Sequence, residues 1–245
     1  MPATPTIAVE RLSHATRGDY LAFFDHEHGP AFADNPEWAR CYCQFYRTPR
    51  ALDWQAFTAS ENRIAAAAAK DPNGYLNTYT QMQEPDHRWG LNGGNDRWQH
   101  DLYNAGAMVE AGVHYYRATG KTRLLDVATK FTNHMCDVMG PPPKANVVPG
   151  HSIAEEAFVR LCLLFREQPE LKQHMPAAID ETAYLRLAQF WIENRGHTEG
   201  RRPFGAYAQD HSPVLEQGTI EGHAVRATLL CAGLVEAGVA AGRSE

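Results

Sequence analysis

The sequence lacks the marks of a membrane or secreted protein. Its first residues contain no basic segment followed by an apolar run, so they do not form a secretory signal peptide. The longest apolar stretch, residues 227–242, contains Glu236 and is shorter than the roughly 20 residues that a membrane-spanning helix needs. The 5 cysteines are odd in number and scattered, which excludes a disulfide framework and indicates a reducing compartment. We therefore expect a cytoplasmic protein with no membrane partner.

Positive charge is also scarce. The 23 Lys and Arg residues face 29 Asp and Glu residues, and the formal net charge of −6 argues against a nucleic-acid partner. Hydrophobic residues make up 44% of the chain and charged residues 21%, which excludes wholesale disorder. The 245 residues allow one large domain or two small ones. Histidine, by contrast, is abundant, with 12 copies of the side chain most used in acid–base and metal chemistry near neutral pH.

Helical periodicity dominates the chain from residue 71 onward. Apolar residues recur there at three- and four-residue steps, and no strand pattern of convincing length is present. The pattern predicts helices over about residues 99–119, 122–140, 152–164, 180–196 and 219–241. The last of these is small or apolar on most sides, so we expect it to be buried on more than one side.

Residues at the predicted helix ends support these boundaries. Gly120 is expected to stop the first helix, and Thr122 and Asp180 are placed to cap the starts of two others. Residues 152–155, Ser-Ile-Ala-Glu, form a capping-box pattern. The three prolines at 141–143 prevent continuation of the second helix.

The connections between the helices alternate between short and long. The first two helices need only about two linking residues, whereas residues 141–151 and more than twenty residues after Gly196 form long links. Short links make antiparallel hairpins, and long links on the other edge bring helix starts to one rim. We expect an all-α fold, a partial (α/α)6 toroid of helix hairpins, with a helical bundle or solenoid as alternatives. A turn signal at 71–74 separates this part, residues 71–245, from a smaller and less regular segment, residues 1–70.

Three histidines stand out by position. His100, His151 and His223 each follow a long link and enter a predicted helix. In a toroid, the starts of alternate helices line the central cavity, and imidazole both donates and accepts hydrogen bonds. The three together are therefore predicted to bind a polyhydroxylated ligand. The alternative for any one of them is that it only caps or packs a helix end, and their shared placement weighs against this for the set.

Acidic and aromatic residues lie near the same rim in the sequence. Glycoside hydrolysis commonly needs two carboxyl groups that face each other across a sugar, and aromatic rings stack on sugars. The acidic residues are Glu155, Glu156, Asp210, Glu216 and Glu221, and the aromatic residues are Tyr75, Tyr79, Trp89, Trp98, Phe204 and Tyr207. Solvated loop charges and core packing are the alternatives for the two groups.

Two other motifs do not carry the chemistry that they suggest. Residues 118–122, Ala-Thr-Gly-Lys-Thr, lack the upstream glycine of a phosphate loop and lie between two helices. His26 and His28, with Cys41 and Cys43, have spacings that do not match zinc sites. We therefore assign no metal ligands.

Several motifs in the second part of the chain resemble glycoside hydrolase family 127, the β-L-arabinofuranosidase-like family. The resemblance covers about residues 71–241 and implies an (α/α)6 barrel in which His100, His151 and His223 match sugar-contacting positions. Asp101 replaces the Glu commonly found beside the first histidine. The motifs, in order and with matching gaps, are DPNGYLNTY at 71–79, HDLYNAG at 100–106, HYYRATGK at 114–121, PGH at 149–151 and EGHAVR at 221–226.

The catalytic residues of that family have no counterpart that can be assigned here. The resemblance implies a zinc-bound cysteine nucleophile and a glutamate acid/base, which lie downstream of the segment 221–226. The chain ends about twenty residues after that segment, and none of its cysteines falls in the matching context. We therefore leave the catalytic residues unknown and expect no cofactor in this chain, whereas the resemblance implies zinc in the complete family member. We also expect a truncated, catalytically incomplete protein.

Residues 18–70 resemble a different family. The segments at 31–43 and 61–69 are similar to the N-terminal segment of GNAT-type acetyltransferases, although the acetyl-CoA-binding loop is not found. The two parts join within an alanine run, as in a chimera. An acetyltransferase relic is therefore one alternative function.

The leading hypothesis is a glycoside-hydrolase-like protein that acts on or binds furanoside sugars. A non-catalytic helical module that binds a sugar or a protein is the other alternative. An incomplete ring leaves apolar helix faces exposed, so we also expect copies of the chain to associate through them.

Overall fold

The computed structural model describes residues 71, 73–77, 80–81, 84–94 and 100–242. The predictions made for residues 1–70 therefore lie outside the described residues. In the described part of the chain there are five α-helices, four short 3-10 helices and no strand beyond two isolated bridges, which confirms the all-α prediction. The α-helices are α6 (Asp101–Thr119), α7 (Arg123–Val138), α8 (Ala154–Glu167), α9 (Glu181–Asn194) and α10 (Ala224–Ala240), and the 3-10 helices are η4 (Pro85–Gly90), η5 (Pro169–His174), η6 (Ala206–Ala208) and η7 (Val214–Glu216).

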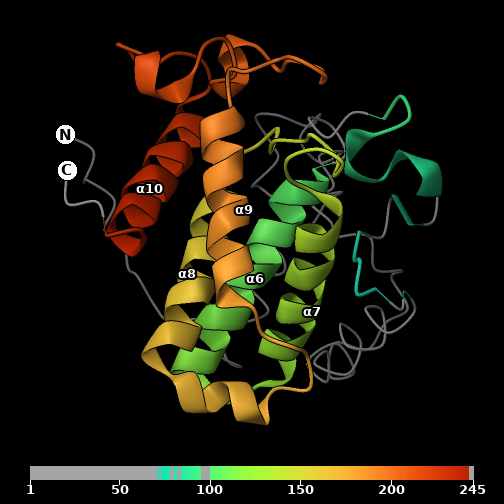
Figure 1. Ribbon diagram of the computed structural model, residues 1–245, viewed down its shortest axis with the longest axis vertical. Helices are drawn as coiled ribbons and strands as arrows, with labels where there is room; N and C mark the ends of the chain where they lie inside the picture. The colour runs from blue at the N-terminus through green and yellow to red at the C-terminus, as the bar shows by residue number, and fades with distance from the viewer. Residues whose placement is uncertain (1–70, 72, 78–79, 82–83, 95–99, 243–245) are drawn as a thin grey trace, which may run out of the picture. The chain divides into compact units, whose positions relative to one another are not determined.

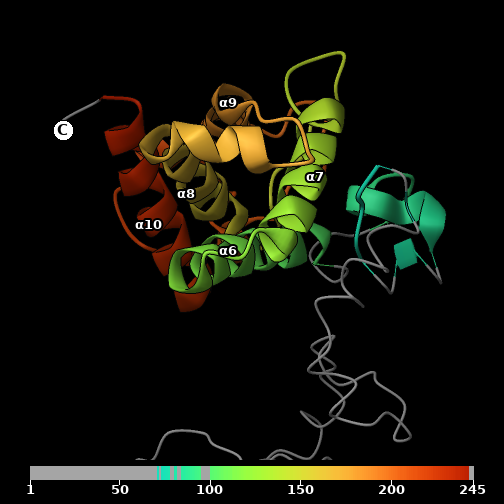
Figure 2. The same ribbon diagram turned by 90° about the horizontal axis from the view of Figure 1, so that it is seen from below.

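The helices pack around α8, which runs parallel to α6 and α10 and antiparallel to α9. Helix α6 packs on α7, and α8 packs on α6, α9 and α10. Seen along the helices, α8 lies between these three partners (Figure 2). Helices α6, α8 and α10 all start at the upper end of Figure 1, where the links 139–153 and 195–223 also lie, whereas the link 168–180 with η5 lies at the lower end. This arrangement is the predicted partial toroid, with the starts of alternate helices on one rim.

The core is built around α8 because this helix has apolar residues on nearly all sides. Phe158 and Phe165 are fully buried, and the Phe158 ring lies 4.9 Å from that of Trp191 on α9. Burying a large apolar side chain contributes about 1.5–3 kcal/mol, so α8 holds its three neighbours together. The buried residues of α8 are Ala154, Glu155, Glu156, Ala157, Phe158, Val159, Leu161, Cys162, Leu164 and Phe165.

Gly106 allows α6 and the start of α8 to approach very closely. A Cβ atom at this position would lie 2.7 Å from the backbone nitrogen of Ala154 and 2.7 Å from Cγ2 of Ile153. Real Cβ atoms do not come so near to backbone, so only glycine fits here. The contact brings the start of α8 against the first two turns of α6.

Several predicted helix ends are confirmed. Gly120 follows α6 with φ of 71°, the left-handed conformation that favours glycine. Asp180 caps α9, because its Oδ1 accepts a hydrogen bond of 2.9 Å from the backbone N–H of Ala183. Thr122 stands at the N-cap of α7 without a side-chain capping bond.

The predicted capping box at residues 152–155 is wrong. Helix α8 begins at Ala154, and its N-cap residue is Ile153, which forms no side-chain capping bond. Oε2 of Glu155 accepts from the backbone N–H of Ile153 at 3.2 Å, and not from that of Ser152 as the predicted box requires. The other oxygen of Glu155 bonds to Arg195, which is distant in the sequence and invisible to a local pattern.

The predicted start and burial of the last helix are also wrong. Helix α10 begins at Ala224, not near residue 219, because Gly222 turns the chain with φ of 78° immediately before it. Within the described residues only one side of α10 is buried, and Val225, Val235 and Val239 are 53–68% exposed. No helix in the described part of the chain is both long and apolar enough to cross a membrane.

Candidate functional site

The structure brings the three predicted histidines together. His100 is the N-cap residue of α6, His223 is that of α10, and His151 lies just before α8. The His151 ring lies 6.3 Å from the His100 ring and 6.1 Å from the His223 ring, centroid to centroid. All three side chains are half-buried. They form a row across the rim where the alternate helices start.

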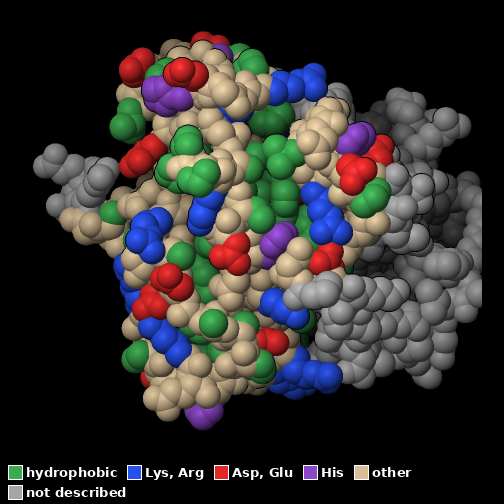
Figure 3. Space-filling model, turned by 45° about the vertical axis from the view of Figure 1, so that its right-hand side comes forward, with side chains coloured by type: hydrophobic (Ala, Val, Ile, Leu, Met, Phe, Trp, Pro, Cys, Tyr) green, Lys and Arg blue, Asp and Glu red, His purple; other side chains and the backbone are tan. Residues whose placement is uncertain are grey.

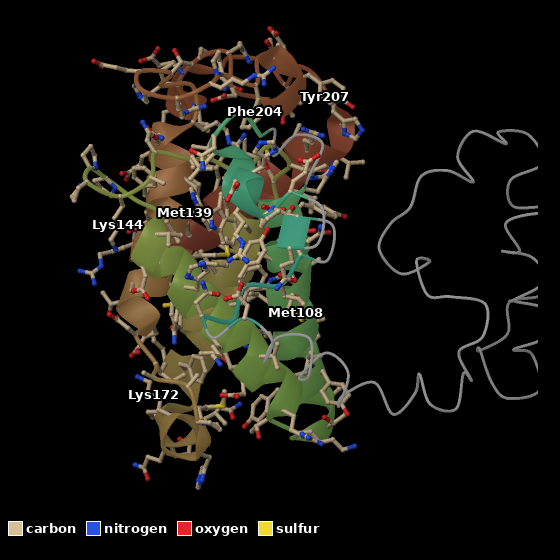
Figure 4. All side chains as sticks on the ribbon, turned by 90° about the vertical axis from the view of Figure 1, so that its right-hand side faces the viewer. Met108, Met139, Lys144, Lys172, Phe204 and Tyr207 are labelled. Carbon is tan, nitrogen blue, oxygen red and sulfur yellow. The ribbon has the colours of Figure 1, made fainter. Side chains whose placement is uncertain are left out.

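Two tyrosines extend this row. The Tyr103 ring stands edge-on to His151 at 4.4 Å, and the Tyr207 ring lies 5.3 Å from His223. Figure 4 shows Tyr207 and Phe204 at the rim, and Lys172 of η5 at the opposite end. Tyr207 is one of the aromatic candidates from the sequence, whereas Tyr103 is not among the predictions. Its signal in the sequence is the three-residue spacing from His100, which places two side chains on one face of a helix.

Asp101 organises the start of α6. Its buried carboxylate accepts hydrogen bonds from Tyr75 Oη at 2.8 Å, from Thr80 Oγ1 at 2.9 Å, from the backbone N–H of Trp89 at 2.7 Å and from Asn77 Nδ2. Burial raises the pKa of Asp101, although these four donors favour its ionised form.

The Asp101 network lies directly beside His100. His100 has φ of 58°, a left-handed conformation that is uncommon for a residue other than glycine. Because Asp101 fixes the first turn of α6, the network holds the backbone on the C-terminal side of His100. In the sequence, Asp101 is visible only as a departure from the family's glutamate.

The loop that carries His151 is held by two buried arginines. Arg195, fully buried, donates to the carbonyl oxygen of Pro149 at 2.9 Å, to that of Ala208 at 2.8 Å and to Glu155 Oε1 at 2.7 Å. Arg226 of α10 donates to the carbonyl oxygen of Gly150. The two carbonyl groups that precede His151 are thus bound by cations from the end of α9 and the start of α10.

His151 is neutral near physiological pH. Burial is the main cause that lowers the pKa of His151 to about 4, and the Arg226 cation and the neighbouring rings of His100 and His223 act in the same direction. Its Nδ1 lies 3.0 Å from the backbone carbonyl oxygen of Ser152. A neutral imidazole can donate and accept at once, which suits a hydroxyl-bearing ligand.

The buried acidic residues near the rim are engaged in structural contacts. Asp210 receives bonds from Arg201 and from the backbone N–H groups of Gly196 at 2.7 Å and Phe204 at 2.8 Å. Burial works to raise the pKa of Asp210, but these donors together hold it below its ordinary value. Glu155 pairs with Arg195, directly after α9, and Glu156 pairs with Arg160 of α8, whereas Glu216 and Glu221 are exposed. The structure therefore favours structural roles over a catalytic pair for the buried acids.

The predicted aromatic residues also divide into buried residues of the core and residues nearer the surface. Tyr75 is fully buried and Trp89 nearly so; their rings meet at 4.8 Å, so these two follow the core-packing alternative. Phe204 lines a small cavity of about 120 Å³. Tyr207 is 42% exposed and lies beside His223. Tyr79 and Trp98 lie outside the described residues.

The residues that the structure describes do not fit the zinc site that the resemblance to glycoside hydrolase family 127 implies. In the described ranges, no group of three or more His, Cys, Asp or Glu side chains is placed to hold a metal. Burial raises the pKa of the Cys136 thiol to about 12 and also raises that of Cys162, so neither is an activated nucleophile. The four side chains whose spacings do not match zinc sites, His26, His28, Cys41 and Cys43, lie outside the described residues.

Charged side chains of both signs are interspersed on the described part of the surface shown in Figure 3. One partly buried cluster ties three helices together: Arg160 of α8 pairs with Glu110 of α6 at 2.9 Å and with Glu236 of α10 at 3.0 Å. These contacts lie on the helix bodies, so they support the arrangement of the rim without forming part of it.

Comparison with known proteins identifies what this arrangement belongs to. Residues 15–244 match the family model of the β-L-arabinofuranosidase GH127 catalytic domain. The non-reducing end β-L-arabinofuranosidase of Bifidobacterium longum subsp. longum is 29% identical over 196 aligned residues, which cover 70% of this chain. A solved GH127 β-arabinofuranosidase is 32% identical with a TM-score of 0.62, and the GH127 β-L-arabinofuranosidase from Geobacillus stearothermophilus T6 is 31% identical with a TM-score of 0.62, each over 78% of this chain.

The matched region is only part of each relative. The chain spans 27% of the Bifidobacterium protein and 28% and 30% of the two solved chains. The family match is continuous across residue 70 and includes the segment that resembles acetyltransferases, a resemblance that it does not support. With the helical fold and the histidine motifs in order, the match over residues 15–244 shows that this chain belongs to the GH127 β-L-arabinofuranosidase family.

Proposed function

We propose that this chain carries a sugar-binding part of a β-L-arabinofuranosidase-type glycoside hydrolase, and that His100, His151 and His223 hold the furanoside. The observation that carries the proposal is the convergence of these three side chains, with ring centroids 6.1 and 6.3 Å apart, from the starts of three separate helices. The relatives named above are β-L-arabinofuranosidases, which supports a furanoside as the ligand.

The row of rings has the chemistry that a sugar requires. Neutral imidazoles exchange hydrogen bonds with hydroxyl groups in both directions, and the rings of Tyr103 and Tyr207 offer apolar surface to the C–H face of a sugar. The role of these residues is to bind and orient the ligand. Cleavage of the glycosidic bond, with retention of configuration, is our proposal for the whole family member, and no nucleophile or acid/base is assigned among the described residues.

Calorimetry with methyl β-L-arabinofuranoside tests the proposal. We expect saturable binding that weakens about tenfold or more in His151→Ala, because one good hydrogen bond is worth about 1.4 kcal/mol or more in a desolvated site. The matched control is His174→Ala, since His174 is an exposed histidine on η5 at the far end of the helices. Wild-type binding with no loss in His151→Ala, or no binding at millimolar sugar, contradicts the proposal.

Association of copies of this chain is proposed for the outer face of α10. Val225, Val235 and Val239 are exposed there, and a groove of about 370 Å³ lies between α9 and α10. Exposed apolar patches favour association. We expect a dimer by sedimentation velocity that dissociates in Val235→Glu, whereas a monomer at all concentrations would argue against it.

A cytoplasmic location is also a proposal. Its support is chemical: Cys136, Cys162 and Cys231 are all free thiols.

A further inference from the structure

Arg226 contacts the surroundings of two site histidines at once. Its guanidinium donates to the carbonyl oxygen of Gly150, the residue before His151. Its backbone N–H donates to Nδ1 of His223 at 3.4 Å. The guanidinium also lies 4.8 Å from the centroid of the Tyr207 ring, which packs beside His223. Arg226 is only 5% exposed, so these contacts are largely shielded from water.

The hydrogen bonds of the two histidines assign opposite tautomers. Nδ1 of His151 lies 3.0 Å from the carbonyl oxygen of Ser152, and a carbonyl oxygen only accepts. The proton of neutral His151 is therefore on Nδ1, and its Nε2 is an acceptor. Nδ1 of His223 accepts from the backbone of Arg226, so the proton of neutral His223 is on Nε2, which is a donor.

We propose that Arg226 is a positioning residue that holds His151 and His223 as an oppositely polarised pair, which binds a sugar hydroxyl by accepting its proton at His151 and donating to its oxygen at His223. The inference rests on the proposed function for its ligand, but the tautomers and the position of the two rings do not depend on any ligand.

The charges around His151 are consistent with this arrangement. The groups that face it are Arg226 of α10, His100 and Tyr103 at the start of α6, and His223. Burial and the nearby cation both disfavour a second proton on the ring. His151 therefore stays a neutral acceptor near neutral pH.

Two-bond ¹H–¹⁵N correlation spectra of the histidine rings test the inference first on the wild-type chain. We expect His151 as the Nδ1–H tautomer between about pH 6 and 8, and the neutral form of His223 as the Nε2–H tautomer. A His151 ring with its proton on Nε2, or one that becomes doubly protonated in this range, overturns the proposal. This measurement needs neither sugar nor a variant.

The variants Arg226→Gln and Arg226→Lys test the guanidinium. In Arg226→Gln we expect the midpoint of the His151 titration to rise, and the binding of methyl β-L-arabinofuranoside to weaken about tenfold or more. Arg226→Lys keeps the charge and one donor group, so we expect both the titration midpoint and the affinity to return part of the way to their wild-type values. The matched control is Arg166→Gln, because Arg166 also donates to a backbone carbonyl, that of Ala240 at 2.9 Å, but at the other end of the same helices.

The outcomes separate the inference from the proposed function. A folded Arg226→Gln variant with the wild-type titration and affinity refutes the positioning role. If the wild-type chain binds no sugar, the proposed function fails, and the titration of His151 in Arg226→Gln still decides whether the guanidinium of Arg226 acts on His151. If Arg226→Gln does not fold, the inference is decided by the tautomers in the wild-type spectra and by the His151 titration and sugar affinity of Arg226→Lys.

Discussion

Replacing Arg195 by methionine tests the physical basis of the rim most severely. Arg195 is 0% exposed and Glu155 is 1% exposed, and their Nη2 and Oε1 atoms are 2.7 Å apart. Methionine keeps much of the volume but leaves the Glu155 carboxylate buried without its cation. It also removes the donors to the carbonyl oxygens of Pro149 and Ala208.

The expected loss follows from these contacts. Breaking a buried ion pair by removing one partner costs about 3–5 kcal/mol, because the remaining charge is uncompensated. A domain of this kind is stable by about 5–15 kcal/mol, so Arg195→Met should fold but unfold at much lower urea concentration. The double variant Arg195→Met/Glu155→Leu removes both charges and should regain a substantial part of that loss.

Equilibrium urea unfolding followed by far-ultraviolet circular dichroism measures these differences. The matched control is Arg117→Met, because Arg117 pairs with Glu167 at the similar distance of 2.8 Å but both side chains are about half exposed, at 46% and 53%. Such a surface pair contributes about 0–1 kcal/mol. The reasoning is refuted if Arg195→Met loses no more than the control, or if the double variant is less stable than Arg195→Met.

Three further perturbations test other parts of the structure by the same assay. Gly106→Ala should destabilise the fold by about 1–3 kcal/mol, because the added Cβ overpacks against the start of α8. In the control Gly218→Ala the added Cβ meets nothing within 4 Å, so stability should change by less than about 0.5 kcal/mol. Equal effects of the two variants would contradict the close approach of α6 and α8. In Asp101→Asn an amide nitrogen replaces one of the two carboxylate oxygens, so two of the four donors lose their acceptor. We expect the free energy of unfolding to fall by about 1–3 kcal/mol for each of these donors, and a variant as stable as wild type would refute the network. The folded-state pKa of Asp210 lies below its ordinary value, so this carboxylate stabilises the fold above about pH 4, and the stabilisation disappears as the pH falls through the lowered pKa. Asp210→Asn should therefore lose less stability than wild type between about pH 4 and 2. The same loss in both proteins would count against this role of Asp210.

The helices and the rim are predictable because their signals are local. Three- and four-residue apolar spacing, the glycine at position 120 and the cap at Asp180 each act within one or two turns. Successive helices then run in alternating directions, which places the starts of α6, α8 and α10 together. For this reason the amino-acid sequence alone predicts that His100, His151 and His223 lie near one another, as their ring separations show. The predicted alternation of short and long links is not kept throughout, because residues 168–180, which include η5, join α8 to α9.

What the sequence could not show depends on contacts between distant residues. The capping box at residues 152–155 failed because α8 begins only at Ala154, and Oε1 of Glu155 bonds instead to Arg195, 40 positions away. Arg226 looks like an ordinary residue of the segment 221–226, and its bond to the carbonyl of Gly150 joins positions 76 apart. Polar networks of this kind have no periodicity in the sequence, so a local sequence pattern does not predict them.

The last helix illustrates a second limit. Its composition predicted burial on more than one side, whereas the described residues cover only the face that contains Ala227, Leu230 and Gly233. Composition reports that a surface is apolar but not what lies against it. The same reasoning misjudged its start, since residues 219–223 form the turn that positions His223.

The central claim is that the three rim histidines hold a furanoside, and a sugar titration followed by histidine-ring NMR tests it most directly. With methyl β-L-arabinofuranoside added to the wild-type chain, we expect saturable shifts of the ring resonances of His100, His151 and His223, while the exposed His174 on η5 stays unchanged. Saturable shifts confined to other histidines, or no shift of these three at saturating sugar, would contradict the account.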